Sequence, residues 1–138
     1  MKDRCRTEVV ELHQFFQQWL SGSLTRTDAT FGRVAQALGS GFTLITPDGV
    51  LVEREALLHS LREAHGTRPD LQIGIKEFRV HHREGKILVA TYLEWQQSAG
   101  SLTVRLSTAI FRETDDRPNN LQWLHVHDTW VSKELAGG

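Results

Sequence analysis

The feature that most restricts the fold of this chain is the separation of its helical and extended segments along the sequence. Apolar residues first recur at helical spacing and later alternate as they do in strands. The predicted helices span residues 8–20, 27–38 and 53–64, and the predicted long strands span residues 71–82, 86–97, 101–113 and 121–132. Helices in one block and strands in another are typical of an α+β fold, in which helices pack on a mainly antiparallel sheet.

The predicted strands are long, at about 11 residues against a usual length of about 5–6. Strands of this length twist and curl, so we expect a curved sheet that forms a cone with an internal cavity beneath the N-terminal helices. Gly39 is expected to cap the second helix, and a short hairpin is predicted around the turn Pro47 to Gly49. The alternation changes phase near Glu77, which predicts a β-bulge. These elements occupy most of the 138 residues, so a single domain over residues 1–138 is expected.

The charge composition argues against several classes of partner. Lysine and arginine number 16, and aspartate and glutamate number 17, so the net charge is −1 and offers no electrostatic footprint for nucleic acid or an anionic membrane. No apolar run reaches the roughly 20 residues of a membrane span, and the charged first residues do not resemble a secretory signal. A cytoplasmic location is therefore expected. Cys5 is the single cysteine, which excludes an internal disulfide and a cysteine zinc cluster.

The pairing of the two middle strands depends on the loop between them. A three-residue loop at 98–100 would pair Gln97 with Ser101, and hence Leu93 with Arg105. Both faces of the sheet then carry several large apolar residues, so neither is a simple solvent face. We expect the helices to cover one face and a second copy of the chain to cover the other, which predicts a homodimer through the outer sheet face.

The last strand carries many of the candidate functional side chains. By alternation, Trp123, His125 and His127 share one face, and Asp128 and Trp130 share the opposite face. A bulge that shifts the strand by one residue would exchange His127 for Asp128 in the cavity. Which face of the sheet lines the cavity therefore stays open.

The histidines His125 and His127 suit more than one role. Two imidazoles at this spacing on a strand can reach one metal ion, or act as an acid and a base near neutral pH. A metal would need a third ligand, and the neighbouring Arg105 would repel a cation, so no metal site is predicted. No phosphate-binding or dinucleotide-binding motif occurs either, and no cofactor is expected. The alternative role is that of hydrogen-bonded histidines in the core or in a dimer interface.

Charged residues within the strands are the other candidates. Arg105 is costly to bury unpaired, so it either holds a ligand carboxylate in a bidentate fork or pairs internally with Asp128 or Glu94. Asp128 interrupts an apolar face, and it is either a general base with a perturbed pKa or a structural partner of Arg105 or of a helix N-terminus. Glu94 beside Tyr92 is either a general base with a nearby hydrogen-bond donor or a solvated strand end.

The tryptophans of the strands supply large apolar area for a core, an interface or a ligand pocket. With them, the predicted ligand-binding residues are Tyr92, Trp95, Arg105, Trp123, His125, His127, Asp128 and Trp130. The catalytic candidates, should the chain be an enzyme, are Asp128 and His127.

Two segments carry a resemblance to a known superfamily. Residues 42–49 read Phe-Thr-Leu-Ile-Thr-Pro-Asp-Gly, and residues 123–127 read Trp-Leu-His-Val-His. Together with the order of the elements, they resemble the nuclear transport factor 2-like, or cystatin-like, superfamily. Within it, the chain is similar to the SnoaL-like proteins and to the association domain of calcium/calmodulin-dependent protein kinase II. This fold hosts isomerases, dehydratases, cyclases, ligand binders and assembly domains, so the resemblance implies no single activity.

The sequence departs from these relatives at the expected site. The cavity of the kinase association domain is lined by several arginines, whereas this chain offers mainly Arg105 and carries Asp128 after its second histidine. Ketosteroid isomerase-like members use a tyrosine on a helix, whereas Tyr92 lies in a predicted strand. Three functions remain open. They are a homodimer that binds a small molecule in its cavity, an isomerase, dehydratase or cyclase that uses Asp128 or His127, and a self-association domain without catalysis.

Overall fold

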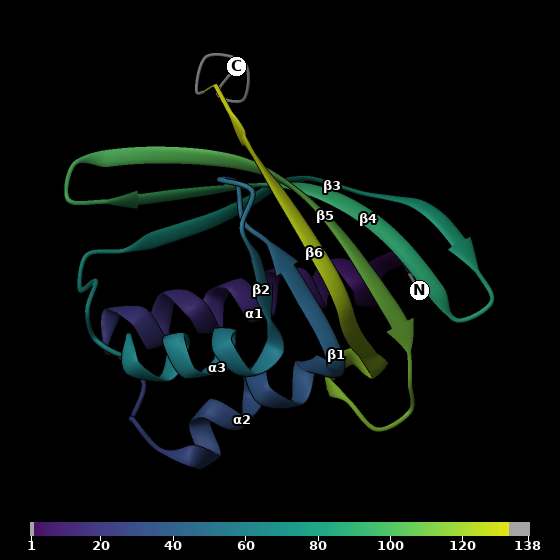
Figure 1. Ribbon diagram of the computed structural model, residues 1–138, viewed down its shortest axis with the longest axis horizontal. Coiled ribbons are helices and arrows are strands. Elements are labelled where there is room, and N and C mark those ends of the chain that lie inside the picture. The colour runs from purple at the N-terminus through teal and green to yellow at the C-terminus, as the bar shows by residue number, and fades with distance from the viewer. Residues whose placement is uncertain (1, 133–138) are drawn as a thin grey trace.

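The computed structural model describes residues 2–132 of the chain (Figure 1). Its helices are α1 (Lys2–Ser21), α2 (Asp28–Ala37) and α3 (Arg54–Glu63), and a short 3-10 turn, η1, spans Pro118–Asn120. Its strands are β1 (Leu38–Ile45), β2 (Leu51–Glu53), β3 (Gln72–Glu84), β4 (Ile87–Ser98), β5 (Ser101–Glu113) and β6 (Leu121–Val131). Among these described residues, no helix combines the length and the apolar character that crossing a membrane requires.

The six strands form a sheet in the order β2-β1-β6-β5-β4-β3. Neighbouring strands run antiparallel except β1 and β6, which pair in parallel and make the sheet mixed. Figure 1 shows the long strands arching over the helices, which all lie on the hollow side of the sheet. The sheet is curved and unclosed, as the twist of long strands favours. The predicted α+β fold, with helices on a curved and mainly antiparallel sheet, is confirmed.

Helix α1 begins earlier than predicted, and α2 ends without the predicted glycine cap. Helix α1 begins at Lys2 rather than at residue 8, because Cys5 lies one turn before Val9 and extends the buried stripe of the helix. The prediction that Gly39 caps the second helix is wrong. Leu38 ends α2 in an extended conformation and begins β1, so the chain passes from helix to strand without a glycine turn.

The hairpin between β4 and β5 has a two-residue loop, so the predicted three-residue loop is wrong. Ala99 and Gly100 both have positive φ, at 52° and 75°. Turns of this backbone type match the right-handed twist of paired strands, which favours them in tight hairpins. Glu94, rather than Leu93, therefore lies opposite Arg105. This one-residue change brings Glu94 and Arg105 to the same face of the sheet.

Bulges reset the alternation in β3 and β6. The backbone of Glu77 has a φ of 53°, and the register of β3 with β4 shifts around it, so the predicted bulge is confirmed. In β6, Trp123 and His125 pair with consecutive residues of β5, which leaves Leu124 as the extra residue. Trp123 therefore turns toward the helices, where its ring lies 4.5 Å from that of Phe111. The prediction that Trp123 shares a face with the two histidines is wrong.

A fully buried carboxylate fixes α1 to the rest of the molecule. Glu8 accepts hydrogen bonds from Arg33 of α2 at 2.7 and 3.3 Å, from Asn119 of η1 at 2.9 Å, and from Trp123 of β6 at 2.8 Å. A buried charge is stable only with partners of this kind. Glu8 therefore joins α1, α2, η1 and β6, and it fixes the orientation of the Trp123 indole.

Candidate functional site

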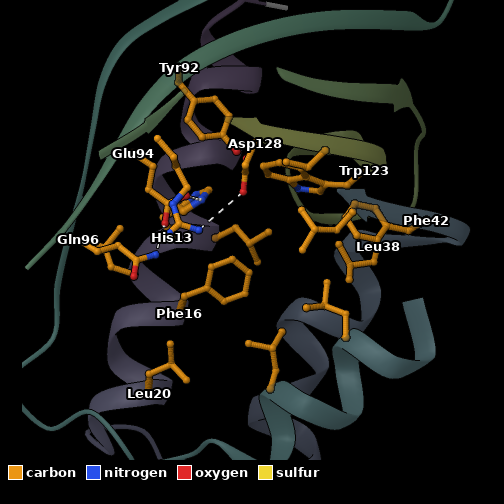
Figure 2. Close-up of a pocket in the computed structure, with 17 residues that line it drawn as sticks. His13, Phe16, Leu20, Leu38, Phe42, Tyr92, Glu94, Gln96, Trp123 and Asp128 are labelled. Atoms are coloured by element: carbon orange, nitrogen blue, oxygen red, sulfur yellow. Dashed lines mark hydrogen bonds and ion pairs between the residues drawn. The ribbon is translucent and has the colours of Figure 1, made fainter. Parts of the chain in front are cut away.

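The helices and the hollow side of the sheet enclose a cavity of about 180 Å³ (Figure 2). Its apolar lining consists of Leu12, Phe16, Leu20, Leu38, Phe42, Leu44, Leu57, Leu61, Ile73, Trp123 and Val126. Its polar lining consists of His13, Tyr92, Glu94, Gln96, Arg105 and Asp128. Figure 2 shows the labelled polar residues gathered on one side, away from Leu38 and Phe42. The cavity thus has a polar end and an apolar end, as small-molecule sites commonly do.

The register of three strands assembles the polar end. Tyr92 of β4 pairs with Ser107 of β5, which pairs in turn with Asp128 of β6. Two residues along β4, Glu94 pairs with Arg105. Side chains two residues apart on a strand point to the same face, so both rows face the helices. Residues from distant parts of the sequence therefore converge at one end of the cavity.

A histidine from α1 and a glutamate from β4 form a buried ion pair at this end. His13 donates from Nδ1 to the carbonyl oxygen of Val9 at 2.7 Å, and its Nε2 lies 3.2 Å from Oε1 of Glu94. Gln96 donates to the other carboxylate oxygen of Glu94 at 2.7 Å. Burial raises the pKa of Glu94, but the charge and hydrogen bond of His13 outweigh burial and lower it to about 2. Burial lowers the pKa of His13, whereas Glu94 raises it, and the net direction is upward.

Asp128 lies beside this pair with weaker partners. Ser107 donates to its Oδ1 at 2.6 Å, whereas Arg105 Nη1 lies 3.8 Å from its Oδ2, beyond hydrogen-bond range. Burial raises the pKa of Asp128, and the negative charge of Glu94 raises it further. The hydrogen bond from Ser107 lowers this pKa, but the net direction is upward. Burial also raises the pKa of Tyr92, which lies opposite Ser107, well above its ordinary value, so the Tyr92 hydroxyl stays protonated. Asp128 is thus the carboxyl of the site that most readily holds a proton.

Arg105 is a cation whose hydrogen bonds are incomplete. Its side chain is 18% exposed, and its Nε is buried without a hydrogen-bond partner among the described residues. Its guanidinium lies over the ring of Trp130, with Cζ 4.9 Å from the ring centroid, and the Trp130 indole N–H donates to Asp48 at 2.9 Å. A guanidinium that lines an apolar cavity is suited to bind an anion.

The structure brings half of the predicted ligand-binding residues to the cavity. These are Tyr92, Arg105, Trp123 and Asp128. Trp95 is not among the lining residues, because its ring covers Gly74, its partner on β3. A Cβ at Gly74 would lie 2.0 Å from this ring, so the indole occupies the space that a side chain would take. Trp95 therefore packs on the sheet and stabilises the pairing of β3 with β4, as aromatic residues opposite a glycine often do.

Three further predicted residues also lie outside the lining. Trp130 is 44% exposed. His125 bonds with Thr43 of the neighbouring strand β1, with 2.8 Å between His125 Nδ1 and Thr43 Oγ1, and His127 is exposed. Both histidines lie on the outer side of β6, because the bulge places Asp128 toward the helices. Of the two catalytic candidates, Asp128 therefore lines the cavity and His127 does not.

Helix α1 contributes to the site, and the sequence pattern did not predict this. His13 and Phe16 lie on the same stripe of the helix as Val9, at helical spacing, and both line the cavity. A histidine on the apolar stripe of an amphipathic helix is a signal that the sequence contains, because a buried polar group needs a partner. Gln96 was missed as well, and its position at the polar end follows only from the register of β4.

A metal site and a nucleophilic cysteine have less support in the described part of the chain. That part contains no group of three or more histidine, cysteine or carboxylate side chains placed to hold a metal ion. Cys5 is buried, and burial raises the pKa of its thiol to about 12, so it does not act as a nucleophile. The site instead combines an ion pair, an arginine and a carboxyl with a raised pKa. This arrangement can hold the polar head of a ligand and exchange a proton with it.

The fold and the site together define an NTF2-like protein, with helices on the hollow side of a curved sheet and a cavity between them. The resemblance inferred from the sequence is confirmed. The family model described as "Sucrose-6-phosphate phosphohydrolase C-terminal" matches residues 5–132. The match covers most of the chain, and the chain belongs to this family. No curated protein matches the chain significantly.

Several solved structures share the fold. An NTF-2-like protein of unknown function from Pseudomonas aeruginosa is 26% identical, with a TM-score of 0.85, and the match covers 94% of this chain and 99% of that one. The CaMKII hub of S. rosetta is 14% identical, with a TM-score of 0.63 and coverage of 71% and 79%. An NTF2-like protein from Rhodospirillum rubrum is 14% identical, with a TM-score of 0.59 and coverage of 94% of both chains. At 14% identity, the last two of these structures show similarity of fold alone.

Proposed function

We propose that this chain binds a small molecule in the cavity, with an apolar body at the apolar end and an anionic head on Arg105. The observation that carries this proposal is the Arg105 guanidinium, which lines a cavity made mostly of apolar side chains and lies 3.8 Å from the Asp128 carboxylate, beyond hydrogen-bond range. His13 and Glu94 offset each other's charge, whereas Asp128 meets Arg105 at 3.8 Å. The guanidinium is therefore the group with capacity for an anion.

The lining favours a carboxylate with a hydrocarbon or aryl body. Eleven apolar side chains leave few donors or acceptors for hydroxyl groups, and desolvating several hydroxyls without partners is costly. The family name refers to a sucrose-6-phosphate phosphohydrolase, but a sugar phosphate would meet one arginine and two carboxyls at the polar end. A monocarboxylate such as octanoate or phenylacetate fits the chemistry of this lining better.

The test is calorimetric titration of the purified chain with octanoate and phenylacetate, and with octanol as a neutral probe of matched chain length. Arg105→Ala should weaken carboxylate binding by roughly 10- to 100-fold, because a hydrogen bond to a charged group contributes about 1.5–3 kcal/mol. Arg112→Ala is the matched control, since Arg112 is an exposed arginine on the same strand and does not line the cavity. Unchanged affinity in a folded Arg105→Ala variant, or no binding of either acid, would overturn the proposal.

A second candidate function is acid and base catalysis at Asp128. The hydrogen bond from Ser107 to Asp128, the position of Tyr92 opposite Ser107, and the raised pKa of Asp128 are the observations that favour it. Solved structures with this fold include proteins described provisionally as a dehydratase and a ketosteroid isomerase. The test is exchange of the α-protons of cyclohexanone in deuterated water, followed by NMR. Catalysed exchange that Asp128→Asn abolishes supports this candidate, and exchange at the buffer rate contradicts it.

We also propose that the chain forms a homodimer through the outer face of the sheet. Leu102 and Leu106 on this face are 37% and 41% exposed, and a solved structure with the same fold is a hub. Light scattering should give about twice the 15.7 kDa mass of the chain. Leu106→Glu should reduce the mass to that of a monomer, whereas His59→Glu, on an exposed position of α3, should leave it unchanged. A monomeric wild-type chain would contradict the proposal.

A further inference from the structure

The charges at the polar end of the cavity balance one another before any ligand binds. The groups that face Asp128 are His13 from α1, Glu94 and the neutral Tyr92 from β4, and Arg105 from β5. Strand β1 and helix α3 contribute only apolar residues to the lining. With both carboxyls ionised and both cations charged, the four charged groups sum to zero.

An anionic ligand disturbs this balance. A carboxylate that enters the cavity adds one negative charge to a site in which Asp128 is 7% exposed and Glu94 is 6% exposed. An uncompensated charge in such surroundings is costly, because the protein interior solvates it poorly. Uptake of one proton restores neutrality, and the position of that proton depends on how firmly each carboxyl is held in its ionised form.

The partners of Glu94 hold it in its ionised form more firmly than the partners of Asp128 hold that carboxyl. Glu94 accepts from Gln96 at 2.7 Å and lies 3.2 Å from the His13 ring nitrogen, so both of its oxygens have partners. Asp128 has a hydrogen bond from Ser107 on Oδ1, whereas its Oδ2 faces Arg105 at 3.8 Å. Oδ2 therefore has room for a proton, and Arg105 loses little when Asp128 becomes neutral.

We propose that the cavity takes up a carboxylate ligand together with one proton from solvent, and that Asp128 holds this proton on Oδ2. The proposal rests on the ligand-binding function proposed above. The ligand carboxylate replaces Asp128 as the counterion of Arg105, and the protonated Oδ2 donates to a ligand oxygen while Oδ1 still accepts from Ser107. One O–H bond forms at Asp128, and no bond to carbon forms or breaks. Figure 2 shows Asp128 directed toward the polar side of the cavity.

This mechanism makes carboxylate binding depend on pH in one direction. Below the free-state pKa of Asp128 the proton is already present, and affinity for an ionised carboxylate is at its plateau. Above that pKa each binding event must draw a proton from solvent, so the dissociation constant rises tenfold for each pH unit until the bound-state pKa is reached. The raised pKa of Asp128 agrees with this assignment.

The experiment is calorimetric titration of the wild-type chain with octanoate between about pH 6 and pH 8, in PIPES and in imidazole at each pH. These buffers differ in ionisation enthalpy, so the difference in measured heat gives the number of protons taken up. We expect up to one proton per octanoate, none for octanol, and weaker octanoate binding at the higher pH. Near pH 6 the raised pKa of His13 keeps this residue protonated, so His13 does not supply the uptake there.

Asp128→Asn supplies the second arm, because asparagine resembles the protonated acid in shape and charge. This variant should bind octanoate more tightly than wild type at the higher pH, without proton uptake. If wild type binds octanoate without proton uptake across the pH range, this inference is overturned and the proposed function stands. The same conclusion follows if proton uptake persists in Asp128→Asn. No octanoate binding at any pH would overturn both. If the variant does not fold, the two-buffer series on wild type decides alone.

Discussion

The substitution Glu8→Gln tests whether the buried carboxylate of α1 holds the molecule together. Glutamine has nearly the same shape as glutamate, so packing stays the same and only charge and hydrogen bonding change. Glu8 is fully buried, and its two oxygens accept four hydrogen bonds from three residues. The variant replaces one of these oxygens by an NH₂ group, which donates and cannot accept.

The loss is the same for either orientation of the amide. If the NH₂ group takes the place of Oε1, it faces Arg33 Nη2 and Asn119, and in place of Oε2 it faces Arg33 Nη1 and Trp123. Two donors therefore lose their acceptor in both cases, and Arg33 loses its buried counterion. At about 1.5–3 kcal/mol for each hydrogen bond to a charged group, the expected loss of stability is roughly 3–6 kcal/mol.

The assay is urea unfolding at neutral pH, followed by circular dichroism, with the free energy of unfolding obtained by linear extrapolation. Glu11→Gln is the matched control, because Glu11 lies on the same helix, has a half-exposed side chain and contacts the same Arg33 and Asn119. Surface pairs of this kind contribute up to about 1 kcal/mol, so the control should unfold near wild type. A Glu8→Gln variant within about 1 kcal/mol of wild type would refute the reasoning.

Three further predictions follow from the described contacts. Gly74→Ala should destabilise the chain by about 2 kcal/mol and lower the melting temperature by roughly 5 °C, because the Trp95 ring must move to make room for the new methyl group. The control is Gly41→Ala, whose methyl group meets open space, and it should leave the stability and the melting temperature unchanged. Glu94→Gln should lower the free energy of unfolding at neutral pH. The difference from wild type should shrink as pH falls from about 4.5 to about 2, because a lowered folded-state pKa stabilises only above the unfolded value; a constant difference in urea titrations would contradict this. Cys5 should react with a thiol reagent after unfolding and remain unmodified in the native chain, and rapid native reaction would show that it is not buried.

The sequence predicted the class of fold because its periodicities are strong and local. The helical stripes of the first part and the alternation of the long strands each follow from which side chains avoid water. The bulge at Glu77 was also predictable, since a bulge leaves a change of phase within the strand itself. The parallel pairing of β1 with β6 was not predicted, because pairing between segments so distant in sequence leaves no local pattern.

The candidate site was predicted in part. Arg105 and Asp128 were identified because charges within apolar strands are unusual in any register. Their relation to Glu94 depended on whether the hairpin loop has two or three residues, and positive φ at a non-glycine residue such as Ala99 is not evident from the sequence. Trp95 was expected at the ligand because the sequence does not show that Gly74 lies opposite it.

By itself, the sequence determined that this chain packs helices on a long curved sheet and that a few charged side chains enter that sheet. Only the tertiary structure decided which charges meet. A single extra residue in β6 places Asp128 toward the helices and the two histidines outside, and a tight turn places Glu94 opposite Arg105. The physical reason is that side chains alternate between the faces of a strand, so a shift of one residue reverses every assignment beyond it.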